Sequence, residues 1–345
     1  MNKAFKIAMA AAVCAAAVCA AAGCGRDDKS KQTMPEYSVY CPDGAPALSL
    51  LNGLNENDDK QFHYHVISSA TVQAQVTGEK PAADFCVLPL NLASKLLGSG
   101  ENYRMLGTVT HGNLYFLTTG ENAPLTRDNL SSLAGKTVGA VQLTNVPGLT
   151  LQAVLAQYEI PYQTIESLQA EKAADKVNLL QMGTDAANVT PAYGCDYYLC
   201  PEPAVTAKIN GTASSPKPFK LAGDLQALYG GEAGYPQAVL VGKKSILTDD
   251  RASADKLVSY FKGNAEYLAT ADTATVLSLL ASVRTEGLAP AFNDKNLSAA
   301  VIANCSVRYE SAKDNKDAVN AFLNKLIAVN PNAASTVSDA FYFLG

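Results

Sequence analysis

Histidine and charge are scarce in this chain. It has three histidines, and charged residues make up 17% of its 345 positions. The histidines are too few and too scattered to complete a metal site, and the spacing of Cys195 and Cys200 matches no metal-binding motif. The sequence therefore predicts that the protein binds no metal and needs no cofactor.

Catalytic signatures are also absent. The chain contains no Gly-x-Ser-x-Gly sequence and no glycine-rich phosphate loop. His63 and His65 alternate along one segment without an obvious acidic partner. Acidic residues outnumber basic ones, and such a surface does not attract nucleic acid. We therefore expect neither an enzyme nor a nucleic-acid-binding protein.

A long uncharged stretch occurs once, at the N-terminus. Lys3 and Lys6 precede 16 uncharged residues, 7–22, and the charged segment 26–31 follows closely. This stretch is shorter than the roughly 20 residues that a membrane-spanning helix needs. The order of basic, apolar and small residues is typical of an export signal. The sequence predicts a signal peptide at residues 1–23 and a mature protein outside the cytoplasm.

The end of this signal, Ala21-Ala22-Gly23-Cys24, resembles a lipobox, in which small residues precede a cysteine that becomes the lipidated first residue. It departs from the usual pattern at Ala21, where leucine is commoner. We expect lipidation at Cys24 and a lipid anchor in the cell membrane, with an ordinary secretory cleavage nearby as the alternative. Residues 24–35 are expected to form a tether. Removal of residues 1–23 takes away two lysines and leaves 25 basic and 32 acidic residues.

Five cysteines follow Cys24, at positions 41, 86, 195, 200 and 305. In an oxidising compartment the plausible disulfides are Cys195–Cys200 and Cys41–Cys86, and the odd number leaves at least one thiol free. Five reduced, buried cysteines are the alternative.

Three β-turn-α units open the mature chain. Strands are predicted at 37–41, 62–67 and 83–88, and helices at 45–54, 71–77 and 91–97. Such repetition favours a parallel sheet with right-handed crossovers. Two more strands are predicted at 105–109 and 114–119. A second αβ region then starts near residue 120, with strands at 137–141 and 197–200, a helix at 149–157 and an amphipathic segment at 170–182.

The last third is mainly helical by pattern. After a strand at 237–241, apolar residues recur at helical spacing in 252–269, 273–283, 297–304 and 317–329. Helices without a sheet of their own must pack on another one, and the first sheet is the available partner.

Several segments resemble those of a known family. They are YCPDGAPAL at 40–48, GEKPAADF at 78–85, LPLNLA at 88–93, HGNLY at 111–115, LAGKTVG at 133–139, PEP at 201–203 and DAFYF at 339–343. In their order and spacing they resemble the solute-binding proteins of ABC importers with the type 2 periplasmic-binding fold. The subgroup most similar is the one associated with nitrate, sulfonate and thiamine-precursor uptake. The likeness spans nearly all of the mature chain.

The resemblance implies an α/β fold with two lobes, each a mostly parallel sheet flanked by helices, joined by a hinge of two crossings. Lobe 1 would comprise 36–117 and 238–345, and lobe 2 would comprise 118–237. It implies a monomer that captures a small-molecule solute between the lobes and delivers it to an ABC permease. The alternative is a sensory or adhesive surface lipoprotein on the same fold. A pyrimidine-forming enzyme also shares the fold, but the cysteine- and histidine-rich features of its relatives are absent.

Candidate ligand contacts follow from the sheet rule that ligands bind beyond the carboxyl ends of parallel strands. In lobe 1 the candidates are Asp43, Gly44, Ala45, Ser68, Ser69, Thr71, Pro89, Asn91, His111 and Asn113, and in lobe 2 they are Thr144, Asn145, Gly148 and Glu202. Each residue also has a purely structural interpretation, as a helix cap, a turn residue or an exposed loop side chain.

The charge of these turns favours one class of solute. They contribute no arginine or lysine, and Asp43 and Glu202 would repel an anion. We therefore expect a neutral or amine-bearing heterocycle, with Tyr40, Tyr115 or Tyr235 available for stacking.

Overall fold

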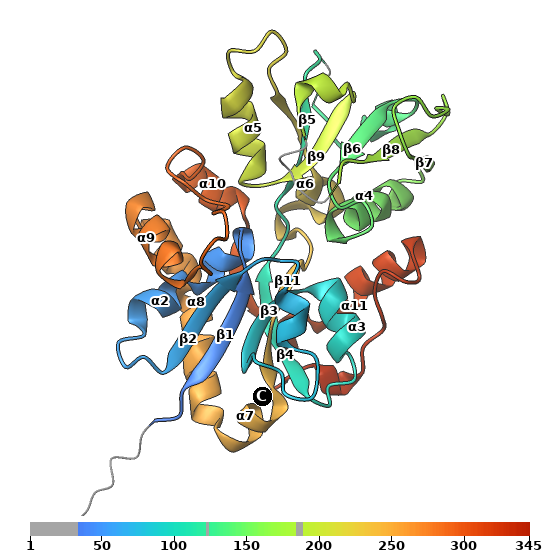
Figure 1. Ribbon diagram of the computed structural model, residues 1–345. Helices are drawn as coiled ribbons and strands as arrows, with labels where there is room; N and C mark the ends of the chain where they lie inside the picture. The colour runs from blue at the N-terminus through green and yellow to red at the C-terminus, as the bar shows by residue number, and fades with distance from the viewer. Residues whose placement is uncertain (1–33, 122–123, 184–188) are drawn as a thin grey trace, which may run out of the picture. The chain divides into compact units, whose positions relative to one another are not determined.

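Two six-stranded sheets organise the part of the chain that the computed structural model describes, residues 34–121, 124–183 and 189–345 (Figure 1). Both sheets belong to one unit, Glu36–Gly345. The predicted signal peptide, Cys24 and most of the predicted tether lie outside the described residues. Among the residues that are described, no helix has the length and apolar character required to cross a membrane.

The first sheet has the strand order β12-β4-β11-β3-β1-β2. Its strands are β1 (Tyr37–Pro42), β2 (Phe62–Ile67), β3 (Phe85–Pro89), β4 (Tyr103–Thr110), β11 (Ala238–Lys243) and β12 (Val307–Ser311). Strand β1 pairs in parallel with β2 and β3, whereas β11 is antiparallel to both β3 and β4, and β12 is antiparallel to β4. Strands β1 to β4 therefore all point in one direction.

The second sheet has the order β10-β5-β9-β6-β8-β7. Its strands are β5 (Leu114–Thr118), β6 (Thr137–Ala140), β7 (Tyr162–Ile165), β8 (Val177–Gln181), β9 (Tyr197–Pro201) and β10 (Lys220–Asp224). Strands β6 to β9 are mutually parallel, and β5 runs antiparallel to its neighbours β9 and β10. Both sheets are thus mixed but mostly unidirectional, and the predicted fold class is confirmed.

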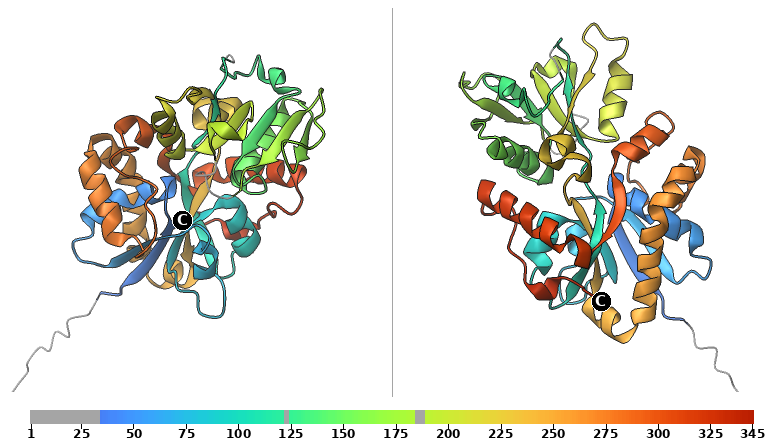
Figure 2. Two further views of the ribbon diagram at one scale, coloured as in Figure 1. Left: turned by 45° about the horizontal axis from the view of Figure 1, so that its top comes forward. Right: turned by 180° about the vertical axis from the view of Figure 1, so that it is seen from behind.

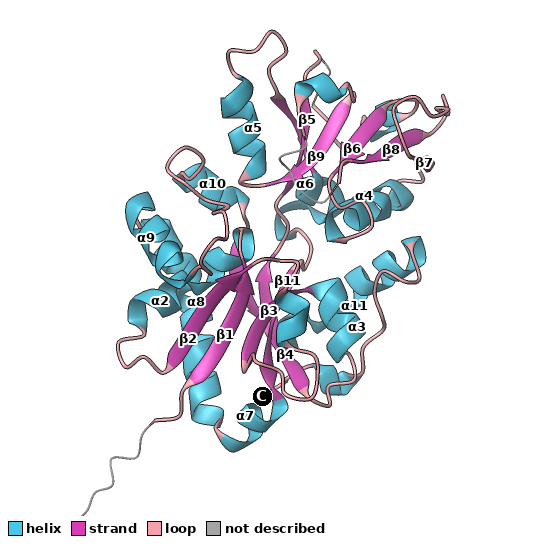
Figure 3. Ribbon diagram, viewed as in Figure 1, coloured by secondary structure: helices cyan, strands magenta, loops and turns pink. Residues whose placement is uncertain are grey.

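Helices flank both sheets (Figure 3). Those that follow or precede strands of the first sheet are η1 (Ala45–Leu50), α2 (Leu51–Glu56), η2 (Val72–Gln75), α3 (Leu90–Leu97), α7 (Lys244–Asp249), α8 (Arg251–Thr270), α9 (Thr273–Val283), α10 (Ala299–Asn304), α11 (Ala312–Val329) and η7 (Asp339–Phe341). Those of the second are η3 (Leu130–Leu133), α4 (Val146–Gln157), η5 (Pro191–Tyr193), α5 (Ala204–Thr212), α6 (Leu225–Gly230) and η6 (Gly231–Ala233). We call each sheet with its helices a lobe; the predicted lobe limits stay a prediction.

The first sheet is buried on both faces. Along β3, Phe85 and Val87 join one hydrophobic cluster, while Cys86 and Leu88 join the cluster on the other face. A strand covered on both sides needs an unbroken apolar run, which explains why β3 does not alternate with polar residues. Helix α8 packs in the first of these clusters, and α11 packs in the second and reaches toward α4 (Figure 2).

The sequence of α8 explains its position. The side chain of Asp250 accepts a hydrogen bond from the Ser253 N–H and so caps the first turn. Leu257, Phe261 and Leu268 then recur at four- and seven-residue spacing and are buried against the sheet. The predicted packing of the late helices on the first sheet is observed here.

Some predicted elements differ from the observed ones. The helix expected at 45–54 begins as the 3₁₀ helix η1, in which Pro46 occupies the first turn, and 71–77 contains only the short η2. The amphipathic segment 170–182 holds no helix, because Val177–Gln181 pairs between β6 and β7 as strand β8. Strand β12 in the last third carries no apolar run, since it lies at the sheet edge with every residue half-buried.

The five described cysteines are free thiols, and all of them are buried. Cys41 and Cys86 lie on neighbouring strands but pack in clusters on opposite faces of the sheet, so their side chains point apart. Burial raises the pKa of Cys195 to about 11 and that of Cys200 to about 12. Neither disulfide considered from the sequence is present in this structure.

Candidate functional site

The carboxyl ends of the parallel strands in the two sheets point toward one another. Strand β4 leaves the first sheet at its carboxyl end, next to the ends of β1 to β3, and the chain enters the second sheet as β5. Because β9 is antiparallel to β5, the carboxyl ends of β9, β6 and β8 lie at the edge where β5 begins. Two strand-end edges therefore meet where the chain passes between the sheets, and this is where ligands of open α/β sheets bind.

Two chain segments connect the sheets at this point. The first crossing is His111-Gly112-Asn113, and the second is 234–237. The crossings bond to each other, since the Tyr235 N–H donates to the His111 carbonyl at 3.2 Å. Gly234 has a φ of +66°, and a Cβ added there would collide with the same carbonyl. Only glycine allows the two backbones to approach so closely.

His111 lies buried in the first crossing, with 2% of its side chain exposed. Its Nε2 atom is 3.3 Å from Oε2 of Glu310 on β12. Arg308 donates to Glu310 at 2.9 Å and to the Ala233 carbonyl beside the second crossing at 2.7 Å. This set of contacts connects β12 to both crossings.

This cluster predicts a dependence of stability on pH. Desolvation lowers the pKa of His111, while the close approach of His111, the largest cause, holds the pKa of Glu310 at about 2. The unfolded chain therefore binds protons more tightly than the folded one at both groups. The stability linked to His111 is present above its unfolded pKa of 6.5 and is lost as the pH falls below it, whereas that linked to Glu310 is present above 4.5 and is lost only as the pH falls toward 2. We expect the free energy of unfolding, measured in urea at pH 7, 6 and 5, to decrease steadily.

Replacement of the histidine tests its share of that decrease. In His111→Gln the loss between pH 7 and 5 should be smaller than in the unsubstituted protein. Desolvation also lowers the pKa of His65, so its protonation destabilises the folded chain in acid as well. Some dependence of the unfolding free energy on pH therefore remains in His111→Gln. An identical profile in His111→Gln would contradict this assignment.

Asn113 and Glu202 lie together at the crossings. The Asn113 side chain donates to the Glu202 carbonyl at 3.1 Å and accepts from Gln237 at 3.1 Å. Glu202 is 3% exposed, and its carboxylate accepts bonds from the N–H and hydroxyl of Thr206 at 3.0 and 2.9 Å. The carboxylate is thus bonded to the first turn of α5, where negative charge is favourable.

The first-lobe turn after β1 contacts a residue that sequence reasoning missed, Arg284. Asp43 accepts the Ala291 N–H at 2.9 Å through Oδ2, and Nε of Arg284 lies 3.6 Å from the same oxygen. The two side chains are only 9% and 11% exposed. Arg284 follows α9 and bridges to Val66 in β2, so it reaches the strand-end edge from another part of the chain.

The other first-lobe candidates divide by exposure. Ser69 and Thr71 are exposed in the turn after β2, where the carbonyl of Ser68 accepts from Thr71. Pro89 precedes α3, and the buried Asn91 is committed to the Ala333 carbonyl at 3.2 Å. The structure therefore leaves the Ser68–Thr71 turn open to solvent and uses Asn91 to hold the C-terminal segment.

The turn after β1 also has an open backbone position. Gly44 has a φ of +100°, which side-chain-bearing residues rarely adopt, and an added Cβ would meet no atom within 4 Å. Ala45, which follows, is buried at the start of η1. An added Cβ at Gly44 would therefore be opposed by its backbone conformation and not by a neighbouring atom.

In the second lobe the candidates lie at the start of α4. Thr144 and Asn145 are exposed, and Asn145 is the N-cap residue without a side-chain cap bond. Gly148 packs against the backbone of Leu143, where a Cβ would collide. Thr144 and Asn145 therefore remain open to solvent, while Gly148 has a packing reason for its identity.

The tyrosines considered for stacking are mostly engaged. Tyr235 is 1% exposed and stacks on Phe322 at 5.2 Å between ring centroids. The Tyr115 hydroxyl donates to the Asn304 carbonyl at 3.0 Å. Tyr40 is half-buried and stacks on His65 at 4.5 Å. Tyr235 is therefore a core residue and does not offer a free ring face.

Comparisons with solved structures identify the fold. A structure described as an ABC transporter from Parabacteroides distasonis is 19% identical to this chain, with a TM-score of 0.67 and coverage of 89% of this chain and 98% of that one. The zinc-bound ligand-binding component of an ABC-type import system from Staphylococcus aureus is 11% identical, with a TM-score of 0.58 and coverage of 90% and 96%.

The periplasmic aliphatic sulphonate binding protein of Escherichia coli is 13% identical, with a TM-score of 0.57 and coverage of 86% of this chain and 87% of that one. No protein-family model and no curated protein matches the chain. At these identities the likeness is one of fold. The predicted fold, that of the solute-binding proteins of ABC importers, is confirmed.

Proposed function

We propose that this protein is an extracytoplasmic receptor that binds a small-molecule solute between its two lobes and delivers it to an ABC permease. The observation that carries the proposal is the opposition of two sets of parallel-strand carboxyl ends across two crossings. The exposed turn residues Ser69, Thr71, Thr144 and Asn145 border this region from both lobes. The fold shared with ABC import proteins supports the same function.

The charge argument for the solute changes with the structure. Asp43 is paired with Arg284, and the Glu202 carboxylate is bonded within its own lobe by Thr206. Only Asp43 has a cation beside it, since the partners of Glu202 are uncharged, so the sequence-based reason against an anion is weakened. The solute class is therefore a question for direct binding measurements.

A thermal-shift screen with sulfonates, amino acids and pyrimidines tests the proposal. A ligand that binds only the folded state adds about 2.7 kcal/mol of stability at a concentration of 100 Kd, so members of one class should raise the melting temperature clearly. Ser69→Arg and Asn145→Arg place bulk at exposed turns on the two lobes and should abolish the shift. The unliganded melting temperature should fall only slightly, since Asn145 makes no side-chain cap bond although Arg is unfavourable at a helix N-terminus. Failure of all three classes to bind would count against the proposal.

We propose in addition that the mature chain is anchored in the membrane through lipidated Cys24, with 25–35 as the tether. An anchor keeps a receptor near its permease, where a freely diffusing one is lost. Cys24→Ala should release the protein to the soluble fraction or trap its precursor, as read by fractionation and by the mass of the N-terminal peptide. An unchanged membrane fraction with an unmodified N-terminal peptide would contradict the anchor.

A further inference from the structure

Two hydrogen bonds join the end of α10, in the first lobe, to the second lobe. The side-chain amide of Asn304 donates to Oε1 of Glu202 at 3.2 Å, and the Tyr115 hydroxyl donates to the Asn304 carbonyl at 3.0 Å. Asn304 belongs to neither crossing. The lobes are therefore connected by polar contacts outside the chain segments that link them.

Each side of this contact is held firmly within its own lobe. On the first-lobe side, Ile302 and Cys305 are buried in the cluster that covers the first sheet, and β12 follows directly. On the second-lobe side, Glu202 is fixed by two bonds from Thr206, and Tyr115 lies within β5 with 7% of its surface exposed. Burial raises the pKa of Tyr115, so its hydroxyl keeps the proton that it donates. A rotation of one lobe must therefore move the donors away from the acceptors.

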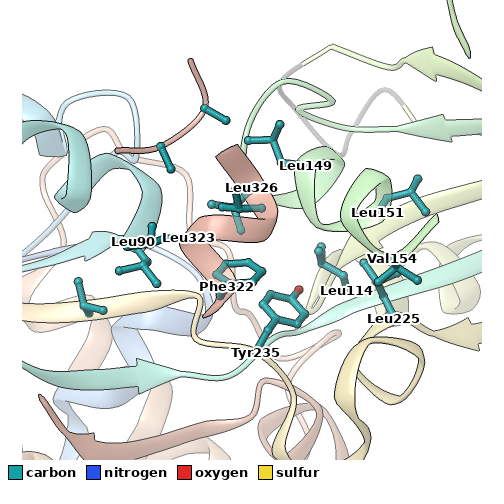
Figure 4. Packing of buried hydrophobic residues seen from close by; sticks show 14 of the residues in the cluster. Leu90, Leu114, Leu149, Leu151, Val154, Leu225, Tyr235, Phe322, Leu323 and Leu326 are labelled. Carbon is teal, nitrogen blue, oxygen red and sulfur yellow. The ribbon is translucent and has the colours of Figure 1, made fainter. Parts of the chain in front are cut away.

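The lobes also touch through an apolar contact of different character. Phe322 and Leu326 of α11 pack in one cluster with Leu149 of α4 (Figure 4). Apolar packing is non-directional and survives small sliding movements between helices, as in shear motions. A hydrogen bond weakens steeply once its angle or length departs from the optimum. Two further hydrogen bonds between the lobes, from Lys325 to Gln157 at 2.7 Å and from Arg308 to the Ala233 carbonyl at 2.7 Å, are exposed to solvent. The Asn304 contacts are partly buried, so we expect them to distinguish more sharply between one arrangement of the lobes and another.

We propose that Asn304 is an interlobe latch: its contacts with Glu202 and Tyr115 hold the two lobes in the arrangement described here and must break when the lobes rotate apart. The latch itself stands on these contacts alone; its role in solute capture rests on the proposed function. It sits at the strand-end edge of the second sheet, so it sets the width of the region in which the solute is proposed to bind.

The test is a distance measurement between the lobes by pulsed electron spin resonance, made without any solute. Spin labels are attached to Ala265→Cys in α8 and Asn210→Cys in α5, which are exposed positions on helices of different lobes. The five native thiols in the described part of the chain are buried, which directs labelling there to the introduced ones. Asn304→Asp brings a second carboxylate against that of Glu202, and the mean distance should increase by more than about 2 Å or the distribution should broaden.

A charge-specific rescue separates the latch from general damage. In the double variant Glu202→Gln with Asn304→Asp, the new amide at 202 can still accept from Thr206 and can donate to the carboxylate at 304, so the bond reforms with reversed polarity. The distance distribution should return to that of the unsubstituted protein. Tyr115→Phe, which removes only a hydroxyl, should shift the distribution in the same direction as Asn304→Asp. Asn55→Asp adds an equal charge at an exposed site in α2 and should change nothing.

The outcomes are distinct. A shift in Asn304→Asp that the double variant reverses supports the latch. An unchanged distribution in Asn304→Asp, or a shift that persists in the double variant, overturns it. Because the distance measurement uses no solute, a failed solute screen does not contradict the latch. A result that overturns the latch likewise does not contradict the proposed solute site. If both proposals hold, Asn304→Asp also changes the apparent Kd for the solute found in the screen.

Discussion

Replacement of Phe322 with alanine is expected to lower the free energy of unfolding by about 3–5 kcal/mol. The ring is fully buried, stacks on Tyr235 and meets Tyr229 edge-on at 5.6 Å. These rings pack with leucines of both lobes in one cluster (Figure 4). Removal of the ring leaves a cavity in the hydrophobic cluster that residues of both lobes build. Close-packed side chains of one lobe cannot move far enough to fill it.

Urea unfolding at pH 7 measures this loss. Asn324→Ala is the matched control, since it lies on the same helix with its side chain exposed, and its effect should stay within about 0.5 kcal/mol. A loss below about 1 kcal/mol in Phe322→Ala would mean that the lobes do not depend on this shared cluster for their stability.

Replacement of Arg284 with methionine is expected to cost about 3 kcal/mol or more, because it leaves the buried carboxylate of Asp43 without its cation. The aliphatic part of the side chain is largely retained, so the loss reports charge more than volume. Asp43→Asn should cost a comparable amount, as it leaves the guanidinium unpaired and weakens the bond to the Ala291 N–H.

A double-mutant cycle decides between pairing and independent roles. If the two groups form one pair, Asp43→Asn combined with Arg284→Met should cost clearly less than the sum of the single losses, because neither charge is then left unpaired. Strict additivity would indicate that the two side chains act independently and that Arg284 stabilises the chain by packing alone.

The candidate site could be predicted only in part. Turn residues after strands were identifiable because β1, β2 and β3 each end at turn formers, and the strand predicted at 62–67 has the observed bounds. Ser69, Thr71, Thr144 and Asn145 are exposed in such turns. Whether they contact a solute remains a prediction. Arg284 gave no such signal, because it follows a helix and approaches Asp43 only through the tertiary fold.

Secondary structure was least predictable where hydrogen bonding to a neighbouring strand outweighs the local periodicity of the sequence. Residues 170–182 were recognised only as an amphipathic segment, yet Val177–Gln181 is a strand because β6 and β7 lie on either side of it. The β12 sequence VRYES has no apolar run, and its pairing with β4 alone gives it extended structure. In both cases the partner strand lies elsewhere in the sequence, so local periodicity carried no information about it.

The sequence by itself determined the elements whose signal is local. These are the predicted export signal, the strands that end at turn formers and the amphipathic helices such as α8. Propensity, capping and periodicity act within a few residues, so a short stretch of sequence is enough to predict them. Only the tertiary structure decided what each polar side chain does. Glu202 stays a candidate ligand contact, and within the fold it bonds Thr206 and Asn304, while Asp43 lies beside Arg284. A buried charge takes the partner that the fold brings within reach, and that partner is distant in sequence.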